Sequence, residues 1–158
     1  MRRSRGCAAS PSPITSPPVP AVASRVLVDA SALLALASRR DQYHARAVGL
    51  ARRFLAAGGR FVGTSLVLGE LHGHLLYRRG PAEARAVVSA LLDDPAYEWL
   101  DVPVALVRDA VSAWLERFRD QRFSMTDAVS FEVMRRERLK TAFAFDQDFE
   151  TAGFGLLR

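Results

Sequence analysis

Four acidic side chains from distant parts of the chain stand where a folded protein could use them together: Asp29, Glu70, Asp127 and Asp146. Carboxylates packed together repel and raise one another's pKa unless a cation compensates. A ligand set made only of oxygen atoms, with no histidine or cysteine, selects hard ions. If the fold brings the four acids to one place, the sequence therefore predicts a site for Mg²⁺ or Mn²⁺.

Each acid, taken alone, also has a structural explanation. Asp29 could cap a following helix through Ser31, and Asp127 could form a capping box with Ser124. Glu70 could be a surface residue, but its neighbours are largely apolar, and an unpaired buried charge is costly. These explanations are independent of one another, whereas a shared site accounts for all the acids with one assumption.

The stretch FAFDQDFE, residues 143–150, holds two candidate acids. Asp146 directly follows the apolar run, and we expect it to be the fourth member of the site. Asp148 lies two residues further on, where it could help through a bound water or simply solvate the turn. Phe149 is expected to pack back onto the core and hold the turn in place.

Short apolar runs alternate with amphipathic segments from Arg25 onward, which indicates strands alternating with helices. The expected strands are residues 25–30, 60–65, 97–103, 140–146 and 154–157, and the expected helices are residues 31–40, 41–59, 66–80, 81–94, 104–120 and 124–139. This alternation predicts a three-layer α/β/α sandwich around a mostly parallel sheet. Ligands bind at the carboxyl ends of the strands in such a sheet, so Asp29 and Asp146 are expected at one edge.

Two finer predictions concern a helix end and a helix face. Ser31 is a plausible N-cap for the helix that follows the first strand. In residues 104–120 an apolar stripe is typical of packing against a core. The stripe consists of Val104, Val107, Val111 and Leu115.

The composition is that of an ordinary globular protein, with 49% hydrophobic and 25% charged residues among 158. This length suffices for one domain with a real core, which we place at residues 25–158. The single cysteine, Cys7, cannot form an internal disulfide, so the cytoplasm is the expected compartment. No apolar run approaches the roughly 20 residues of a membrane-spanning helix.

The net charge of +5 depends largely on the N-terminal end. Residues 1–24 are rich in Pro, Ser and Ala and lack an amphipathic period, which predicts a disordered leader. Residues 1–25 contain four arginines and no acid, which leaves 18 basic against 17 acidic residues in the rest of the chain. The body is therefore nearly neutral, and any binding of nucleic acid cannot rest on a strongly basic field.

Four segments together resemble PIN-domain ribonucleases, and most closely the VapC-type toxins of type II toxin–antitoxin pairs. The segments are VLVDASALLAL, TSLVLGELHGHLL, FSMTDAVSFEVMRR and AFAFDQDFETAGF. None is specific alone, but the ordered set at this spacing is, and the likeness extends from Arg25 to Leu157.

The resemblance implies that the four acids form the quartet that binds Mg²⁺ or Mn²⁺ in that family. It implies that Ser31 and Thr126 orient a carboxylate, a bound water or a phosphate. Such enzymes hydrolyse RNA with a metal-activated water and leave a 5′-phosphate and a 3′-hydroxyl. Many are dimers inhibited by an antitoxin, so the expected partners are RNA, a cognate antitoxin and a second copy of the chain.

Several residues resemble functional motifs but have simpler structural explanations. The stretch ELHGHLL is not the HExxH motif of zinc proteases, and only Glu70 and His74 share a helix face. The arginine-rich run at residues 135–138 is typical of a solvated helix face, although it could hold phosphates. Trp99 and Trp114 are expected in the core or at an interface.

Three other functions are compatible with parts of the sequence. The same fold could process RNA without an antitoxin. A haloacid-dehalogenase-like phosphatase also has an Asp after its first strand, but it needs a second Asp where Ser31 stands, and Lys140 is the only lysine. A non-catalytic binding module would tolerate a broken acidic quartet, whereas this quartet is complete and no glycine-rich phosphate loop accompanies it.

Overall fold

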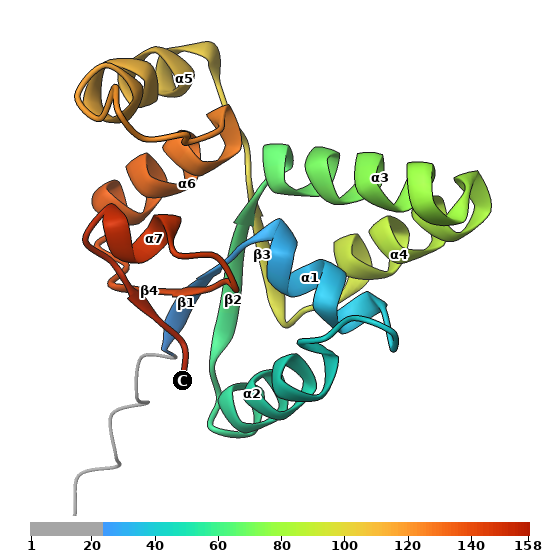
Figure 1. The fold of residues 1–158 in the computed structure, drawn as a ribbon. Helices are drawn as coiled ribbons and strands as arrows, with labels where there is room; N and C mark the ends of the chain where they lie inside the picture. Colours follow the sequence, from blue (N-terminus) through green and yellow to red (C-terminus); the bar gives the residue numbers. More distant parts are fainter. Residues whose placement is uncertain (1–23) are drawn as a thin grey trace, which may run out of the picture.

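Five parallel strands form one sheet in the order β3–β2–β1–β4–β5 (Figure 1). The computed structural model describes residues 24–158, so the predicted leader lies outside the described residues apart from Ser24. The strands are β1 (Arg25–Val28), β2 (Arg60–Thr64), β3 (Tyr97–Leu100), β4 (Thr141–Phe143) and β5 (Gly155–Leu156). The prediction of a mostly parallel sheet is confirmed.

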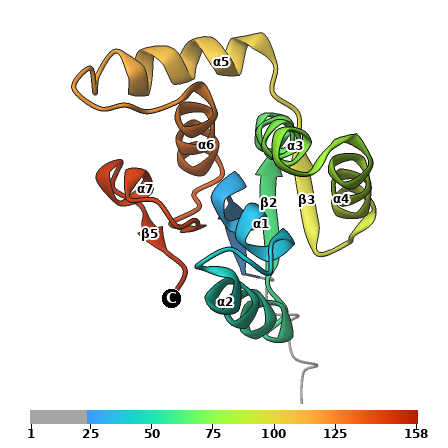
Figure 2. The same ribbon diagram turned by 45° about the vertical axis from the view of Figure 1, so that its right-hand side comes forward.

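Helices cover both faces of the sheet. They are α1 (Ala30–Ala37), α2 (His44–Ala56), α3 (Ser65–Arg79), α4 (Pro81–Asp93), α5 (Val104–Ala110), α6 (Met125–Arg136) and α7 (Asp148–Thr151), with a π-helical segment, η1, at Val111–Leu115. One apolar core packs α1 to α4 against the sheet, and a second packs α5, η1, α6 and α7 against the other face. In Figure 2 the two groups stand apart, with α3 and α4 to the right and α6 and α7 to the left. The predicted α/β sandwich is therefore confirmed.

The strands read as continuous apolar runs because both of their faces are buried. Val26 and Val28 belong to the first core, while Leu27 between them belongs to the second. Such runs are typical of parallel strands covered by helices on both sides. None of the helices in residues 24–158 is long and apolar enough to cross a membrane.

Asp29, and not Ser31, caps the first helix. The backbone of Asp29 is extended (φ −99°, ψ 159°), and its carboxylate accepts a hydrogen bond of 2.9 Å from the N–H of Ser31. The helix therefore begins at Ala30, and the prediction of Ser31 as the N-cap is wrong. A carboxylate placed two residues earlier already satisfies the free N–H that a Ser31 cap would have served.

The helix predicted over residues 104–120 changes its winding halfway. After α5 the chain widens into η1, where the N–H of Glu116 donates to the carbonyl of Val111 at 2.9 Å. The side chains buried along α5 and η1 are Leu106, Ala110 and Trp114, while Val104 is 70% exposed. The predicted stripe is thus wrong at Val104, because α5 and η1 pack on α6 through a different face.

Glu132 is a fully buried carboxylate that ties α6 to its surroundings. It accepts hydrogen bonds from Arg135 at 2.7 and 2.9 Å, from Arg136 at 2.7 Å and from Nε1 of Trp114 at 3.3 Å. The hydrogen bonds from Arg135, and then those from Arg136 and Trp114, lower the pKa of Glu132 to about 2 against the effect of burial. Arg136 also pairs with Asp109 of α5. The arginine-rich run therefore has a structural role in which two of its arginines are already engaged.

Replacing Glu132→Gln should lower the free energy of unfolding at pH 7 by about 2 kcal/mol, because charge-assisted hydrogen bonds are lost and the paired arginines are screened by solvent. The pKa of Glu132 in the fold lies below its ordinary value of 4.5, so its contribution is complete above pH 4.5 and is lost as the pH falls towards 2. Urea unfolding at pH 7 and at pH 3 measures both effects. A matched control is Glu116→Gln, whose side chain is exposed; equal losses in the two variants would contradict the assignment.

Candidate active site

Asp29 and the loop of Asp146 meet where the strand order changes direction. From β1 the chain continues to β2 and β3 on one side, and it later returns to β4 on the other side of β1. Such switch points open a crevice at the carboxyl ends of the strands. The N–H of Asp29 donates to the carbonyl of Phe143, the last residue of β4, at 3.0 Å. The chain that leads to Asp146 therefore starts beside Asp29.

The hydroxyl of Ser31 connects these two segments. It donates a hydrogen bond of 2.6 Å to Oδ2 of Asp29 and accepts one of 3.1 Å from the N–H of Phe145. One hydroxyl thus fixes the orientation of the Asp29 carboxylate, which is 4% exposed, and holds the backbone immediately before Asp146.

The strand expected to run to residue 146 ends at Phe143, so that boundary is wrong. The reason is that the N–H of Phe145 bonds to Ser31 and not to a neighbouring strand. The Phe145 ring stacks on Tyr43, with centroids 4.7 Å apart and planes within 4°, and the guanidinium of Arg46 lies 5.6 Å from its centroid. Asp146 consequently belongs to an anchored loop and does not directly follow the strand.

The second half of FAFDQDFE forms α7, a short helix that the sequence did not suggest. The N–H of Asp148 donates to Oδ1 of Asp146 at 3.2 Å, and both side chains are partly buried. Burial, and then the charge of Asp127, raise the pKa of Asp148. Phe149 is fully buried, which confirms that it packs back onto the core.

Asp127 reaches the same edge from the first turn of α6. It forms the predicted capping box with Ser124: the N–H of Asp127 donates to Oγ of Ser124 at 3.1 Å, and Oδ2 of Asp127 accepts from the N–H of Ser124 at 2.7 Å. Thr126 beside it is partly buried, and within residues 24–158 its side chain makes no hydrogen bond.

Glu70 comes from α3, which starts where β2 ends. Thr64 closes β2 and caps α3, because its hydroxyl accepts a hydrogen bond of 3.4 Å from the N–H of Val67. Glu70 follows about one and a half turns later. Oε1 of Glu70 lies 4.0 Å from Nε2 of His74, which confirms that the two share a helix face.

The pKa values show that the four acids form one electrostatic cluster. Burial raises the pKa of Asp29, against hydrogen bonds from Ser31, and the charges of Asp127 and Glu70 raise it further. Burial raises the pKa of Asp146 to about 7, and the charges of Asp29 and then Asp127 add to this rise. We call Asp29, Glu70, Asp127 and Asp146 the acidic cluster.

The chemistry of the acidic cluster suits a hard divalent cation. Within residues 24–158 no arginine or lysine forms an ion pair with Asp29, Asp127 or Asp146. Across the same residues, no three His, Cys, Asp or Glu side chains lie close enough together to hold an ion as they stand. The missing element is therefore positive charge, and all the available donors are carboxylate oxygens, which Mg²⁺ and Mn²⁺ prefer.

Sequence reasoning did not single out Thr64 or Phe145, although both position acids of the cluster. For Thr64 a signal existed, because a threonine between an apolar run and a helical segment is a typical N-cap. For Phe145 there was none, since an aromatic residue within an apolar run reads as part of a strand.

Comparison with known proteins agrees with this arrangement. Residues 26–155 match the family model described as PIN domain. The chain belongs to the PIN-domain family, and this membership confirms the resemblance found in the sequence. Within the family it is a homologue of the VapC-type toxins.

Two comparisons place it near one such toxin. The 23S rRNA-specific endonuclease VapC20 of Mycobacterium tuberculosis is 36% identical over 130 residues, which cover 82% of this chain and 95% of the relative. The crystal structure of Mycobacterium tuberculosis VapC20, described as a sarcin–ricin loop cleaving toxin, matches with a TM-score of 0.70 at 33% identity, over 82% of this chain and 95% of that one.

More distant structures share the fold. VapBC2 from Rickettsia felis, bound to a DNA fragment from its promoter, matches with a TM-score of 0.60 at 14% identity, covering 84% of this chain and 96% of that one. FitAcB from Neisseria gonorrhoeae matches with a TM-score of 0.59 at 13% identity, with the same coverage.

Replacing Asp146→Asn should stabilise the metal-free protein at alkaline pH. The pKa of Asp146 is about 7 in the fold against 3.8 ordinarily, so the fold favours the protonated acid and loses stability as the pH rises from 3.8 through 7. The variant should exceed the parent by about 1–3 kcal/mol at pH 8, after allowance for solvent screening, and match it near pH 4.

Chemical denaturation in the presence of a chelator, at pH 4 and at pH 8, measures this difference. Asp120→Asn is the matched control, because Asp120 is exposed and its carboxylate bonds only to Gln121 among the described residues. A variant no more stable than the parent at pH 8 would show that Asp146 does not bear the repulsion of the cluster.

Proposed function

We propose that this protein is a Mg²⁺- or Mn²⁺-dependent endoribonuclease that hydrolyses RNA phosphodiester bonds and acts as the toxin of a toxin–antitoxin pair. The observation that carries this proposal is the acidic cluster at the switch point of a PIN fold. Its members raise one another's pKa, and no basic side chain is ion-paired with Asp29, Asp127 or Asp146 among the described residues. The nuclease domain is residues 25–158.

The residues that hold the cation are Asp29, Glu70, Asp127 and Asp146. A bound divalent cation supplies Lewis-acid activation of water and neutralises charge on the phosphodiester. The nearby positive charge also returns Asp146 to its ionised form at neutral pH. Metal uptake is therefore accompanied by proton release.

The remaining residues of the site position these ligands. Ser31 orients the carboxylate of Asp29, and the N–H of Asp148 holds one oxygen of Asp146. Thr126, next to Asp127 at the same edge, orients water or a phosphate oxygen with a hydroxyl that forms no bond within the described chain. Fixed carboxylates of this kind spend no reorganisation energy when the substrate arrives.

The proposed substrate is a loop of the large ribosomal RNA. The support is the relative at 36% identity, which is described as 23S rRNA-specific, and its crystal structure, which is described as that of a sarcin–ricin loop cleaving toxin. A toxin of this type needs an inhibitor in the cell that makes it. The proposed partners are accordingly a cognate antitoxin and a second copy of the chain, and the proposed compartment is the cytoplasm.

Replacing Asp127→Asn should reduce divalent-dependent RNA cleavage by at least about 100-fold, because several kcal/mol of transition-state stabilisation depend on the cation. The fold should remain intact, since asparagine keeps an oxygen that can accept from the N–H of Ser124. Total cellular RNA, incubated with Mn²⁺ or with chelator and followed by mapping of the cut ends, measures the loss and identifies the target.

Asp120→Asn serves as the matched control for this experiment and should cleave like the parent. The expected products carry a 5′-phosphate and a 3′-hydroxyl, with the cut in a loop of 23S rRNA. Full activity in a folded Asp127→Asn protein would exclude the metal site as assigned, and full activity of the parent in chelator would exclude the metal dependence.

Asp146 and Asp148 should differ in their effect on metal binding. Asp146 lies under the influence of Asp29 and Asp127, whereas Asp148 is influenced by Asp127 alone and supports Asp146 through its backbone N–H. Calorimetric titration with Mn²⁺ should therefore give a loss of affinity of at least about tenfold for Asp146→Asn and a smaller one for Asp148→Asn. A larger loss in Asp148→Asn would reverse the assignment of ligand and supporting residue.

A further inference from the structure

A basic hollow of about 590 Å³ lies between the C-terminal ends of α1 and α3. We call it the arginine hollow. Its lining residues are Ala37, Arg39, Arg40, Arg78, Arg79 and Glu83. It is separate from the acidic cluster, because none of the four cluster residues lines it.

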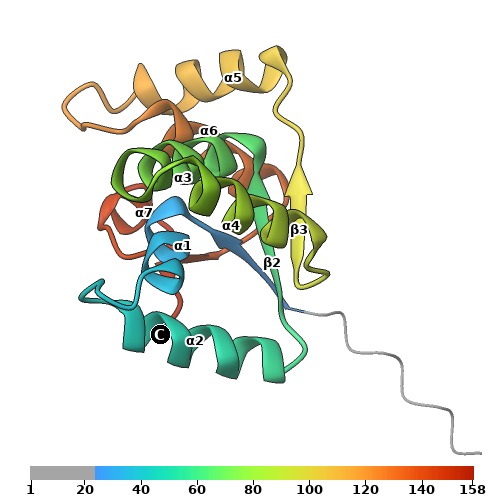
Figure 3. The ribbon, with the colours of Figure 1, turned by 90° about the vertical axis from the view of Figure 1, so that its right-hand side faces the viewer.

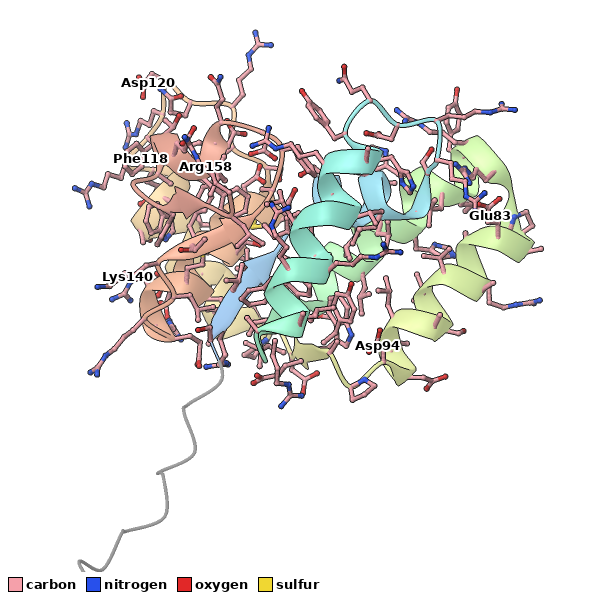
Figure 4. All side chains as sticks on the ribbon, turned by 90° about the horizontal axis from the view of Figure 1, so that it is seen from below. Glu83, Asp94, Phe118, Asp120, Lys140 and Arg158 are labelled. Atoms are coloured by element: carbon pink, nitrogen blue, oxygen red, sulfur yellow. The ribbon has the colours of Figure 1, made fainter. Side chains whose placement is uncertain are left out.

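The two helix ends are joined at the hollow. Arg79, in the last turn of α3, donates a hydrogen bond of 2.7 Å to Oγ of Ser38, the C-cap of α1, and pairs with Glu83 of α4. Figure 3 shows α3 and α4 side by side, with α1 next to them. In Figure 4, Glu83 lies at the α3–α4 end of the molecule, far from Lys140 and Arg158. This bridge holds the arginines from two segments in one place.

The charge of the hollow is largely uncompensated. Arg39, Arg40 and Arg78 are exposed and form no ion pair within residues 24–158, and Glu83 is the only acid of the lining. Basic side chains near a helix C-terminus are favoured by the helix dipole, which explains their presence at each end separately. Two ends meeting at one hollow concentrate positive charge on a body that is otherwise nearly neutral, and such a hollow attracts an anion.

The hollow lies within reach of a strand bound at the acidic cluster. Along α1, Asp29 precedes Ala37 by eight residues, and along α3, Glu70 precedes Arg78 by the same number. At 1.5 Å per residue, both helices separate the cluster from the hollow by about 12 Å. Since α1 and α3 pack against each other, the two routes run side by side over the same part of the surface.

We propose that the arginine hollow binds the phosphate backbone of the RNA substrate on one side of the bond that is cut. This inference rests on the proposed ribonuclease function. Guanidinium groups bind phosphates through paired hydrogen bonds, and such contacts position a nucleic acid without reading its sequence. The acidic cluster repels RNA, so attraction has to come from elsewhere on the chain, and the hollow supplies it.

The test compares the double variant Arg39→Gln/Arg40→Gln with Arg52→Gln/Arg53→Gln, which removes the same charge from exposed positions on α2. The probe is a labelled oligouridylate of about 12 nucleotides, within the site sizes of single-strand-binding proteins. Binding is measured in chelator, so that neither cleavage nor metal bridging contributes. The hollow variant should bind on the order of tenfold more weakly and lower the slope of log K against log salt by about 0.7 per lost contact, while the control matches the parent.

Equal behaviour of the two double variants would overturn the proposal, because the effect would then follow total charge. Unchanged RNA binding combined with weaker binding of the cognate antitoxin would also overturn it, and would assign the hollow to the antitoxin. Arg78→Gln provides a second, single variant, with circular dichroism and thermal unfolding to establish that each protein is folded. The proposed ribonuclease function fails by a different result, namely absence of cleavage by the parent protein with Mn²⁺.

Discussion

The candidate site depends on one hydroxyl group, that of Ser31. It donates to the carboxylate of Asp29 and accepts from the backbone of Phe145, and so it joins residues 114 positions apart in the chain. Without it, neither the orientation of Asp29 nor the start of the loop that carries Asp146 would be fixed at the switch point of the sheet. Parallel strands deliver the two segments to one edge, but a hydrogen bond sets their final relation.

The site is a place where the fold works against electrostatic repulsion. Asp29 and Asp146 are held among like charges, and their raised pKa values measure the strain of that arrangement. Stabilising contacts lie elsewhere, most clearly at Glu132, whose buried carboxylate is satisfied by Arg135, Arg136 and Trp114. The two kinds of carboxylate differ in their surroundings alone: one has permanent cationic partners and the others do not.

The sequence allowed the sheet, its parallel strands and the grouping of the four acids to be predicted, because these follow from apolar runs and from the positions of acids after them. The errors occur where a distant group decides the outcome. The strand before Asp146 stops early because its N–H finds Ser31, and Ser31 is not a cap because the carboxylate of Asp29 acts first. The π-helical turn that buries Trp114 likewise reflects packing against α6, which no local pattern encodes.

The position of β1 between β2 and β4 also governs when the protein becomes complete during synthesis. The segments that form the arginine hollow end at Glu83, so they leave the ribosome early, whereas β4 and the loop of Asp146 come from the last part of the chain. Pairing of β1 with β4 has to wait for them, and it carries the closure entropy of a long loop. A nascent or prematurely terminated chain thus lacks an assembled acidic cluster. The order of the strands delays catalytic competence until translation is nearly finished, which protects the ribosome that is making the protein.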